Sequence, residues 1–148
     1  MRWLPIPSPG RVLERFRFPR FRSSAHRNAR HRLGRQGERL AERYLKSQKY
    51  TTLARNHRTR FGEIDLIMRA PDGAIAFIEV KTRASGNAIH ALGVNQQRRL
   101  LQQAVMTVRR HGWTDQRYRI DLVAVTPGTQ RGERPVIRHI PNAVSLGR

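Results

Sequence analysis

The sequence predicts an α/β domain with a central mixed sheet flanked by helices, in the element order α-β-β-β-α-β with one added strand. Two stretches, residues 35–47 and 95–111, place their apolar residues at the spacing of an amphipathic helix. The segments between and after them are short apolar runs bounded by turn residues, which is typical of buried strands. A chain of 148 residues suits a single domain with a core of its own.

The first helix is expected over residues 35–47, where Ala41, Tyr44 and Leu45 share one face. Glu38 borders this apolar face from the first turn of the expected helix. Three strands are expected after it, at residues 50–56, 63–68 and 74–81.

The last two of these strands are expected to form a hairpin around residues 71–73. In this Pro-Asp-Gly turn the proline fixes φ and the glycine takes the left-handed position. A three-residue loop of this kind pairs Ala70 with Ala74. Side chains alternate along a strand, so residues two apart share a face. The register then sets three pairs opposite each other: Asp65 and Glu79, Glu63 and Lys81, and Ile67 and Phe77.

The second half of the chain continues the alternation of helix and strand. A loop is expected at residues 82–93, followed by a helix that Asn95 caps and that ends near His111. Gly112 then stops the helix. Two more strands are expected, at residues 118–126 and 136–140.

Residues 1–33 differ from the rest and are expected to form a flexible basic arm, while residues 34–148 form the folded domain. Residues 1–32 hold nine arginines, a single acid and four prolines, and their apolar residues follow no sustained period. The arm is either an ill-ordered tail or a segment that contacts nucleic acid. Its composition also resembles an organelle transit peptide, which is a weaker interpretation.

The charge of the chain indicates its partners. There are 30 Lys and Arg residues against 10 Asp and Glu, a formal net charge of +20. Such an excess favours nucleic acid over an anionic membrane surface as the partner. The absence of cysteine excludes disulfides and thiolate metal sites. No apolar run reaches the roughly 18 residues of a membrane span, and no signal-peptide pattern follows Met1.

The scarce acids gather in the two strands of the expected hairpin. Asp is a poor strand former, so Asp65 between Ile64 and Leu66 indicates a functional role. Directly opposed carboxylates repel each other and favour a cation between them. A hard ion such as Mg²⁺ prefers carboxylate oxygens together with substrate phosphate. With Lys81 two residues after Glu79, the pattern predicts a metal-dependent site that cleaves phosphodiester bonds.

A set of short motifs resembles one known family. In order and spacing they resemble the YraN family of uncharacterised bacterial proteins, which is similar to the PD-(D/E)XK nuclease superfamily. The resemblance implies a restriction-endonuclease-like core, also seen in Holliday-junction resolvases, and leaves the basic arm outside. It further implies a cytoplasmic bacterial protein, for which association with the nucleoid is an option. The motifs are GxxGExxA at residues 34–41, RN at 55–56, GEIDLI at 62–67, FIEVKxR at 77–83 and RID at 119–121.

The resemblance also implies roles for individual residues at a Mg²⁺ or Mn²⁺ site. Asp65 and Glu79 are the expected metal ligands, together with the backbone carbonyl of Val80. Lys81 is expected to act on the attacking water and on the developing phosphate charge. Glu38 is expected to approach the metal from the first helix. The structural alternatives are a strand Asp neutralised by arginine, an exposed Glu–Lys ion pair, and a helix-terminal Glu favoured by the helix dipole.

Contacts with nucleic acid are expected from cationic and polar side chains around the acidic strands. The YraN family usually has Lys where Gln96 stands, so Gln96 either contacts a phosphate or is an exposed helix residue. No base-reading motif is recognisable, so we expect recognition of backbone or shape. The resemblance thus predicts a DNA endonuclease that favours DNA over RNA, with branched DNA as a candidate substrate and a homodimer as an option. The expected contact residues are Arg55, Arg58, Arg60, Arg83, Gln96, Arg98 and Arg99.

Two further acids are expected to be structural. Glu63 is expected to orient Lys81, and Asp121 to pair with Arg119 or another core arginine. The six histidines show no metal-ligand spacing. The alternative to an endonuclease is a non-catalytic DNA- or RNA-binding accessory protein with the same fold, because fold and chemistry are separable. A ribosome- or RNA-associated basic protein is a third, weaker interpretation.

Overall fold

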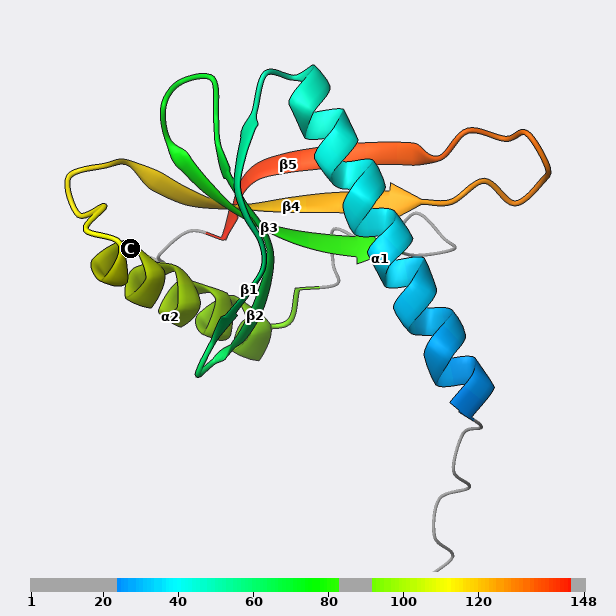
Figure 1. The fold of residues 1–148 in the computed structure, drawn as a ribbon, viewed down its shortest axis with the longest axis horizontal. Helices are drawn as coiled ribbons and strands as arrows, with labels where there is room; N and C mark the ends of the chain where they lie inside the picture. Colours follow the sequence, from blue (N-terminus) through cyan, green and yellow to red (C-terminus); the bar gives the residue numbers. More distant parts are fainter. Residues whose placement is uncertain (1–23, 83–91, 145–148) are drawn as a thin grey trace, which may run out of the picture.

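The computed structural model describes residues 24–82 and 92–144, and within them the chain forms two helices and one five-stranded sheet (Figure 1). The strands lie in sequence order across the sheet; β3 and β4 are parallel, and the other neighbours are antiparallel. The predicted α/β class, the mixed sheet and the order of the elements are confirmed. The elements are α1 (Ser24–Ser47), β1 (Thr51–Thr59), β2 (Gly62–Arg69), β3 (Ile75–Thr82), α2 (Val94–Arg110), β4 (Tyr118–Thr126) and β5 (Val136–Val144).

The two helices cover opposite faces of the sheet, and each packs on its own apolar cluster. On the α1 side Leu45 packs with Ile78 of β3. On the α2 side Leu100 and Val108 pack with Phe77 of the same strand. Burial of each large side chain of this kind contributes about 1.5–3 kcal/mol. Neither described helix has the length and apolar content needed to cross a membrane.

The β2–β3 hairpin has the predicted turn and register. The N–H of Ala70 donates to the carbonyl of Ala74 over 2.9 Å, and Gly73 has a φ of 82°, in the left-handed region. Ile67 lies opposite Phe77, as predicted. The turn therefore fixes the alignment of the two strands that carry the scarce acids.

Both helices begin at residues other than those predicted. α1 begins at Ser24 and passes through the boundary expected between residues 33 and 34. The side chains of residues 28–33 are all exposed, because the helix reaches the sheet only after them. No apolar face therefore marks this part of the helix in the sequence. α2 begins at Val94, and the expected cap at Asn95 is wrong. The N-cap is Gly93, whose backbone carbonyl accepts the first bonds of the helix without a side-chain cap.

Two strands are longer than predicted: β1 continues to pair with β2 through polar residues, and β5 resumes its pairing with β4 at Val144 after a register shift. β1 continues to Thr59 and β5 to Val144. Residues 1–23 of the expected arm, nearly all of the expected loop at 82–93, and with it Arg83, lie outside the described residues.

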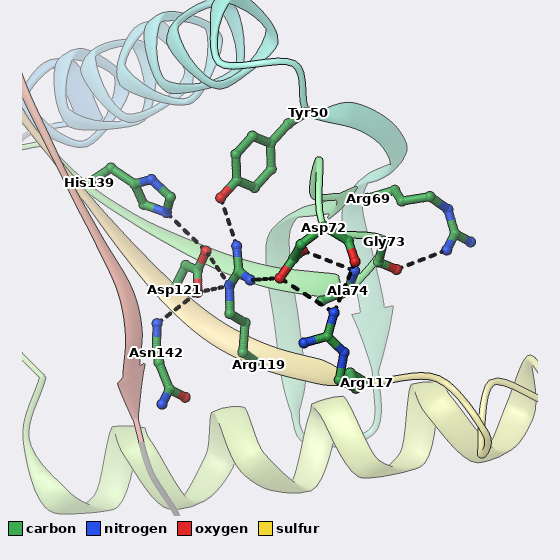
Figure 2. A network of polar contacts seen from close by, with 10 residues as sticks. All are labelled: Tyr50, Arg69, Asp72, Gly73, Ala74, Arg117, Arg119, Asp121, His139 and Asn142. Carbon is green, nitrogen blue, oxygen red and sulfur yellow. Dashed lines mark hydrogen bonds and ion pairs between the residues drawn. The ribbon is translucent and has the colours of Figure 1, made fainter.

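A buried polar network joins β4, β5 and the β2–β3 turn (Figure 2). Asp121 is fully buried and accepts a hydrogen bond from Arg119 (Nε to Oδ1, 3.0 Å). His139 Nε2 lies 2.9 Å from its other oxygen, and the backbone N–H of Asn142 donates to Oδ1 over 2.9 Å. Arg119 also contacts Asp72 of the turn at 3.3 Å. The predicted pairing of Asp121 with Arg119 is confirmed, and these contacts indicate a structural role for this acid.

Candidate functional site

Asp65 lies where β2 and β3 separate. The ladder between these strands ends at the pair of Leu66 and Ile78. Beyond it, the backbone N–H of Val80 is bound by the Asp65 carboxylate (N to Oδ2, 2.7 Å). β1 bends at the same level, because Asn56, which lies across from Asp65 in the β1–β2 register, has a φ of 46°. A carboxylate therefore replaces a backbone partner at the point where the sheet opens.

Glu79 of β3 brings the second carboxylate to this opening. Its side chain is buried, and its Oε1 accepts hydrogen bonds from Lys81 Nζ and from Gln96 Nε2, each over 2.7 Å. Lys81 lies on the same face of β3, and Gln96 reaches the site from the first turn of α2. The structure thus gathers four residues predicted from the sequence, and Gln96 contacts a carboxylate rather than lying exposed on its helix.

The electrostatics of the site make Asp65 unusual among carboxyl groups. Burial, followed by the charge of Glu79, raises the pKa of Asp65 from its ordinary 3.8 to about 7, although the hydrogen bond from Val80 opposes the shift. The carboxyl group of Asp65 therefore titrates near neutral pH. A bound cation would favour the charged form, because it offsets both the burial and the repulsion.

Each carboxylate keeps one oxygen that has no protein hydrogen bond within the described part of the chain. Asp65 uses Oδ2 and leaves Oδ1, while Glu79 uses Oε1 and leaves Oε2. Such a pair fits Mg²⁺, which is usually held by one or two carboxylates plus water and substrate phosphate. Across residues 24–82 and 92–144, no group of three His, Cys, Asp or Glu side chains could hold an ion. Within the described residues, the free oxygens of Asp65 and Glu79 are the candidate ligands that the two strands bring together.

Glu38 lies near this pair without joining it. It sits on α1 beside Gly37, whose missing Cβ lets the helix rest directly on Thr82 at the end of β3. The Glu38 carboxylate accepts a hydrogen bond from Asn56 Nδ2 over 3.1 Å. Its charge is one of the smaller causes that raise the pKa of Asp65. The structure thus places Glu38 at the border of the site, bound to Asn56 and close enough to Asp65 to influence its charge.

Glu63 does not have the role expected from the register. Its carboxylate is partly exposed and pairs with Arg58 Nε of β1 at 3.0 Å, whereas Lys81 pairs with Glu79. The β2–β3 ladder has ended at this level, so Glu63 has only β1 as a neighbouring strand. The expectation that Glu63 orients Lys81 is wrong. An exposed ion pair such as Glu63–Arg58 contributes about 0–1 kcal/mol.

The arginines expected to contact nucleic acid fall into different environments. Arg55 is held by Glu42 of α1 through two hydrogen bonds of 2.9 and 2.7 Å. These bonds, with those from neighbouring residues, lower the pKa of Glu42 to about 2. Arg60 lies over the ring of Phe61, 4.7 Å from its centroid. Arg58, Arg98 and Arg99 are exposed.

Asn56 contributes to the site, although the RN motif at residues 55–56 predicts no role for it. It connects β1 to α1 through Glu38, and its positive φ supplies the bend of β1 next to Asp65. Asn adopts this conformation more readily than most residues. An asparagine within an expected strand is the feature of the sequence that could have indicated this bend.

The family model that matches the chain is described as Uncharacterised protein family UPF0102. It matches residues 37–125, which is more than half of the 148 residues. This range contains Glu38, Asp65, Glu79 and Lys81, so the whole acidic site falls within the match.

The chain is also similar to bacterial proteins named UPF0102 protein. It is 39% identical to one from Trichlorobacter lovleyi over 113 residues, covering 74% of this chain and 87% of the relative. It is 41% identical to one from Anaeromyxobacter dehalogenans over 120 residues, covering 78% and 86%. It is 41% identical to one from Geobacter metallireducens over 118 residues, covering 77% and 93%. These names state no activity.

Proposed function

The chain belongs to the UPF0102 family, as its resemblance to YraN proteins predicts, and we propose that it is a Mg²⁺-dependent DNA endonuclease of the PD-(D/E)XK type. One observation carries the proposal: Asp65 and Glu79 meet beside Lys81 where β2 and β3 separate. The order of the elements from α1 to β4, with β3 and β4 parallel, supports a restriction-endonuclease-like core.

The residues of the site suit hydrolysis of a phosphodiester bond. Asp65 and Glu79 would hold the metal ion, with the Val80 carbonyl as the further ligand implied by the resemblance. When bound, the ion supplies Lewis-acid activation of water and of the scissile phosphate. Lys81 Nζ donates to Glu79 Oε1 over 2.7 Å, and from this position the side chain can stabilise the negative charge that develops on the phosphate. Gln96 donates to Glu79 from α2 and fixes the orientation of this carboxylate.

DNA is the proposed substrate because the chain is strongly cationic. Its formal net charge is +20, and exposed arginines such as Arg58, Arg98 and Arg99 are suited to phosphate contacts. The sequence contains no recognisable base-reading motif, so the shape of the DNA would decide recognition. Branched DNA, with its distinctive backbone geometry, is therefore the first substrate to test.

A cleavage assay tests this proposal. The purified chain is incubated with linear duplex, single-stranded, flap and four-way-junction DNA in Mg²⁺, Mn²⁺ or EDTA. We expect metal-dependent cleavage that is lost in Lys81→Ala and retained in Lys46→Ala, a matched loss of one lysine from the exposed side of α1. Tight DNA binding without cleavage in any metal would instead support a non-catalytic accessory protein.

A further inference from the structure

A polar cleft separates α1 from the β1–β2 hairpin. Its volume is about 700 Å³. One wall comes from α1, and the other comes from β1 and the start of β2. The lining side chains are Arg30, His31, Arg35 and Glu38 on the helix, Asn56 and Arg58 on β1, and Glu63 on β2.

The cleft continues along α1 toward the middle of the sheet. A second hollow, of about 400 Å³, shares Arg35, Glu38 and Asn56 with the first and extends to Arg39, Arg55 and Glu42, the acid that pairs with Arg55. The two hollows are neighbours along α1, and the hydrogen bond between Asn56 and Glu38 joins their walls where they meet. We call the two hollows together the α1 groove.

The helix wall of the α1 groove carries the free positive charge. Arg30, Arg35 and Arg39 are exposed, and within the described part of the chain none of them has an acidic partner within 4.0 Å. On the opposite wall, Arg55 and Arg58 are already paired with acids. An anionic ligand in the groove would therefore be bound mainly by α1.

These arginines recur at helical spacing. Arg35 and Arg39 are one turn apart, which corresponds to about 6 Å along the helix axis, and Arg32 and Arg43 extend the same face at either end. A row of cations along a straight helix suits a ligand with anionic groups repeated along its length, such as a sugar-phosphate backbone.

The floor of the α1 groove adjoins the acidic pair. Asn56 lines the groove and lies across from Asp65 in the β1–β2 register. Glu38, which binds Asn56, lines both hollows. Leu66, the residue directly after Asp65, lines the second hollow. A chain lying in the groove would thus pass the point where β2 and β3 separate.

We propose that the α1 groove binds a single strand of nucleic acid through its phosphates and leads it to the Asp65–Glu79 site. This inference rests on the proposed endonuclease function and specifies the form of its substrate. A single strand is narrow enough to place its phosphates inside the groove, against the arginines of the helix wall that are unpaired within residues 24–82 and 92–144. A duplex is a wide cylinder and could touch only the rims of these hollows. Among the described residues, the lining contains no Phe, Tyr or Trp, so the proposed binding depends on the sugar-phosphate backbone rather than on base stacking.

The test measures binding in EDTA, so that it does not depend on cleavage. Fluorescence anisotropy compares a labelled single-stranded oligo-dT with a hairpin duplex of equal nucleotide number at several salt concentrations. The double variant Arg35→Gln/Arg39→Gln is compared with Arg131→Gln/Arg134→Gln, a control with the same loss of charge in the exposed connection between β4 and β5. All four residues are exposed, so no variant disturbs the core.

We expect the wild type to bind oligo-dT more tightly than the duplex. The groove variant is expected to bind oligo-dT at least tenfold more weakly than the control, and to lower the slope of log affinity against log salt by about 1.4, or roughly 0.7 for each lost phosphate contact. Equal affinity of the groove and control variants, or tighter binding of the duplex by the wild type, would overturn the inference. If the wild type shows the expected binding but cleaves no DNA in Mg²⁺ or Mn²⁺, the result would count against the endonuclease function and still support binding of a single strand in the groove.

Discussion

We expect the substitution Asp65→Asn to stabilise the folded protein at alkaline pH. The asparagine side chain keeps an oxygen that accepts the Val80 N–H but carries no charge to be buried next to Glu79. Burial and Glu79 raise the pKa of Asp65 from 3.8 to about 7. Since one pKa unit corresponds to about 1.4 kcal/mol, ionised Asp65 lowers the free energy of unfolding by on the order of 4 kcal/mol.

The sign of this effect gives it a defined pH dependence. Below pH of about 4, Asp65 is protonated in both the folded and the unfolded chain, so its titration has no influence. As the pH rises toward 7, the unfolded chain releases this proton before the folded protein does, and the wild type loses stability. Above pH 7 the loss is complete. The advantage of Asp65→Asn therefore grows between pH 4 and 7 and then stays constant.

The assay is urea unfolding in EDTA, followed by circular dichroism at pH 4, 6 and 8. Asp115→Asn serves as the control, because Asp115 is exposed in the turn after α2. At pH 8 we expect Asp65→Asn to exceed the wild type by a few kcal/mol, and Asp115→Asn to match the wild type. Addition of Mg²⁺ at pH 8 is expected to stabilise the wild type and the control only. A wild type as stable as Asp65→Asn at pH 8, or a difference independent of pH, would refute the reasoning.

Three further substitutions test the surroundings of the site. Asp121→Ala leaves the largely buried guanidinium of Arg119 without its main partner, and we expect chemical denaturation to show a loss of about 3–5 kcal/mol with metal binding intact. Gly37→Ala places a Cβ against Thr82, so α1 must shift. We expect a lower thermal midpoint of unfolding and weaker DNA binding. An unchanged midpoint would contradict the close packing of α1 on β3. Glu42→Gln removes a carboxylate whose pKa is lowered to about 2, so stability is expected to fall at pH 7 while the difference from wild type narrows as the pH drops from 4.5 toward 2.

The carboxylates of the site were predictable because their chemistry is unusual for their positions. Asp65 and Glu79 stand in apolar strands of a chain with few acids, and the Pro-Asp-Gly turn aligns those strands. The residue types of this segment therefore predict both the hairpin and the positions of the acids on its strands. Gln96 was placed near the site by resemblance, and its contact with Glu79 is a tertiary detail that spacing alone could not supply.

The departures from the predicted structure have a common physical cause. The expected opposition of Glu63 and Lys81 assumed that the β2–β3 ladder continues, whereas the side chain of Asp65 ends it by binding Val80. The start of α1 was missed because the exposed turns before residue 34 carry no apolar stripe. Asn95 was expected to cap α2 because of its residue type, but the backbone turns at Gly93. Each of these features depends on backbone geometry that residue pattern does not encode.

Asp65 and Glu79 are proposed to bind a divalent metal, and a Mn²⁺ titration followed by electron paramagnetic resonance measures whether they do. At pH 8 the wild type and Asp115→Asn are expected to bind Mn²⁺ at a site for which added Mg²⁺ competes. Glu79→Gln and Asp65→Asn are expected to lose this site while keeping a folded circular dichroism spectrum. Mn²⁺ binding that is equally strong in all four proteins, or absent from the wild type, would contradict the account.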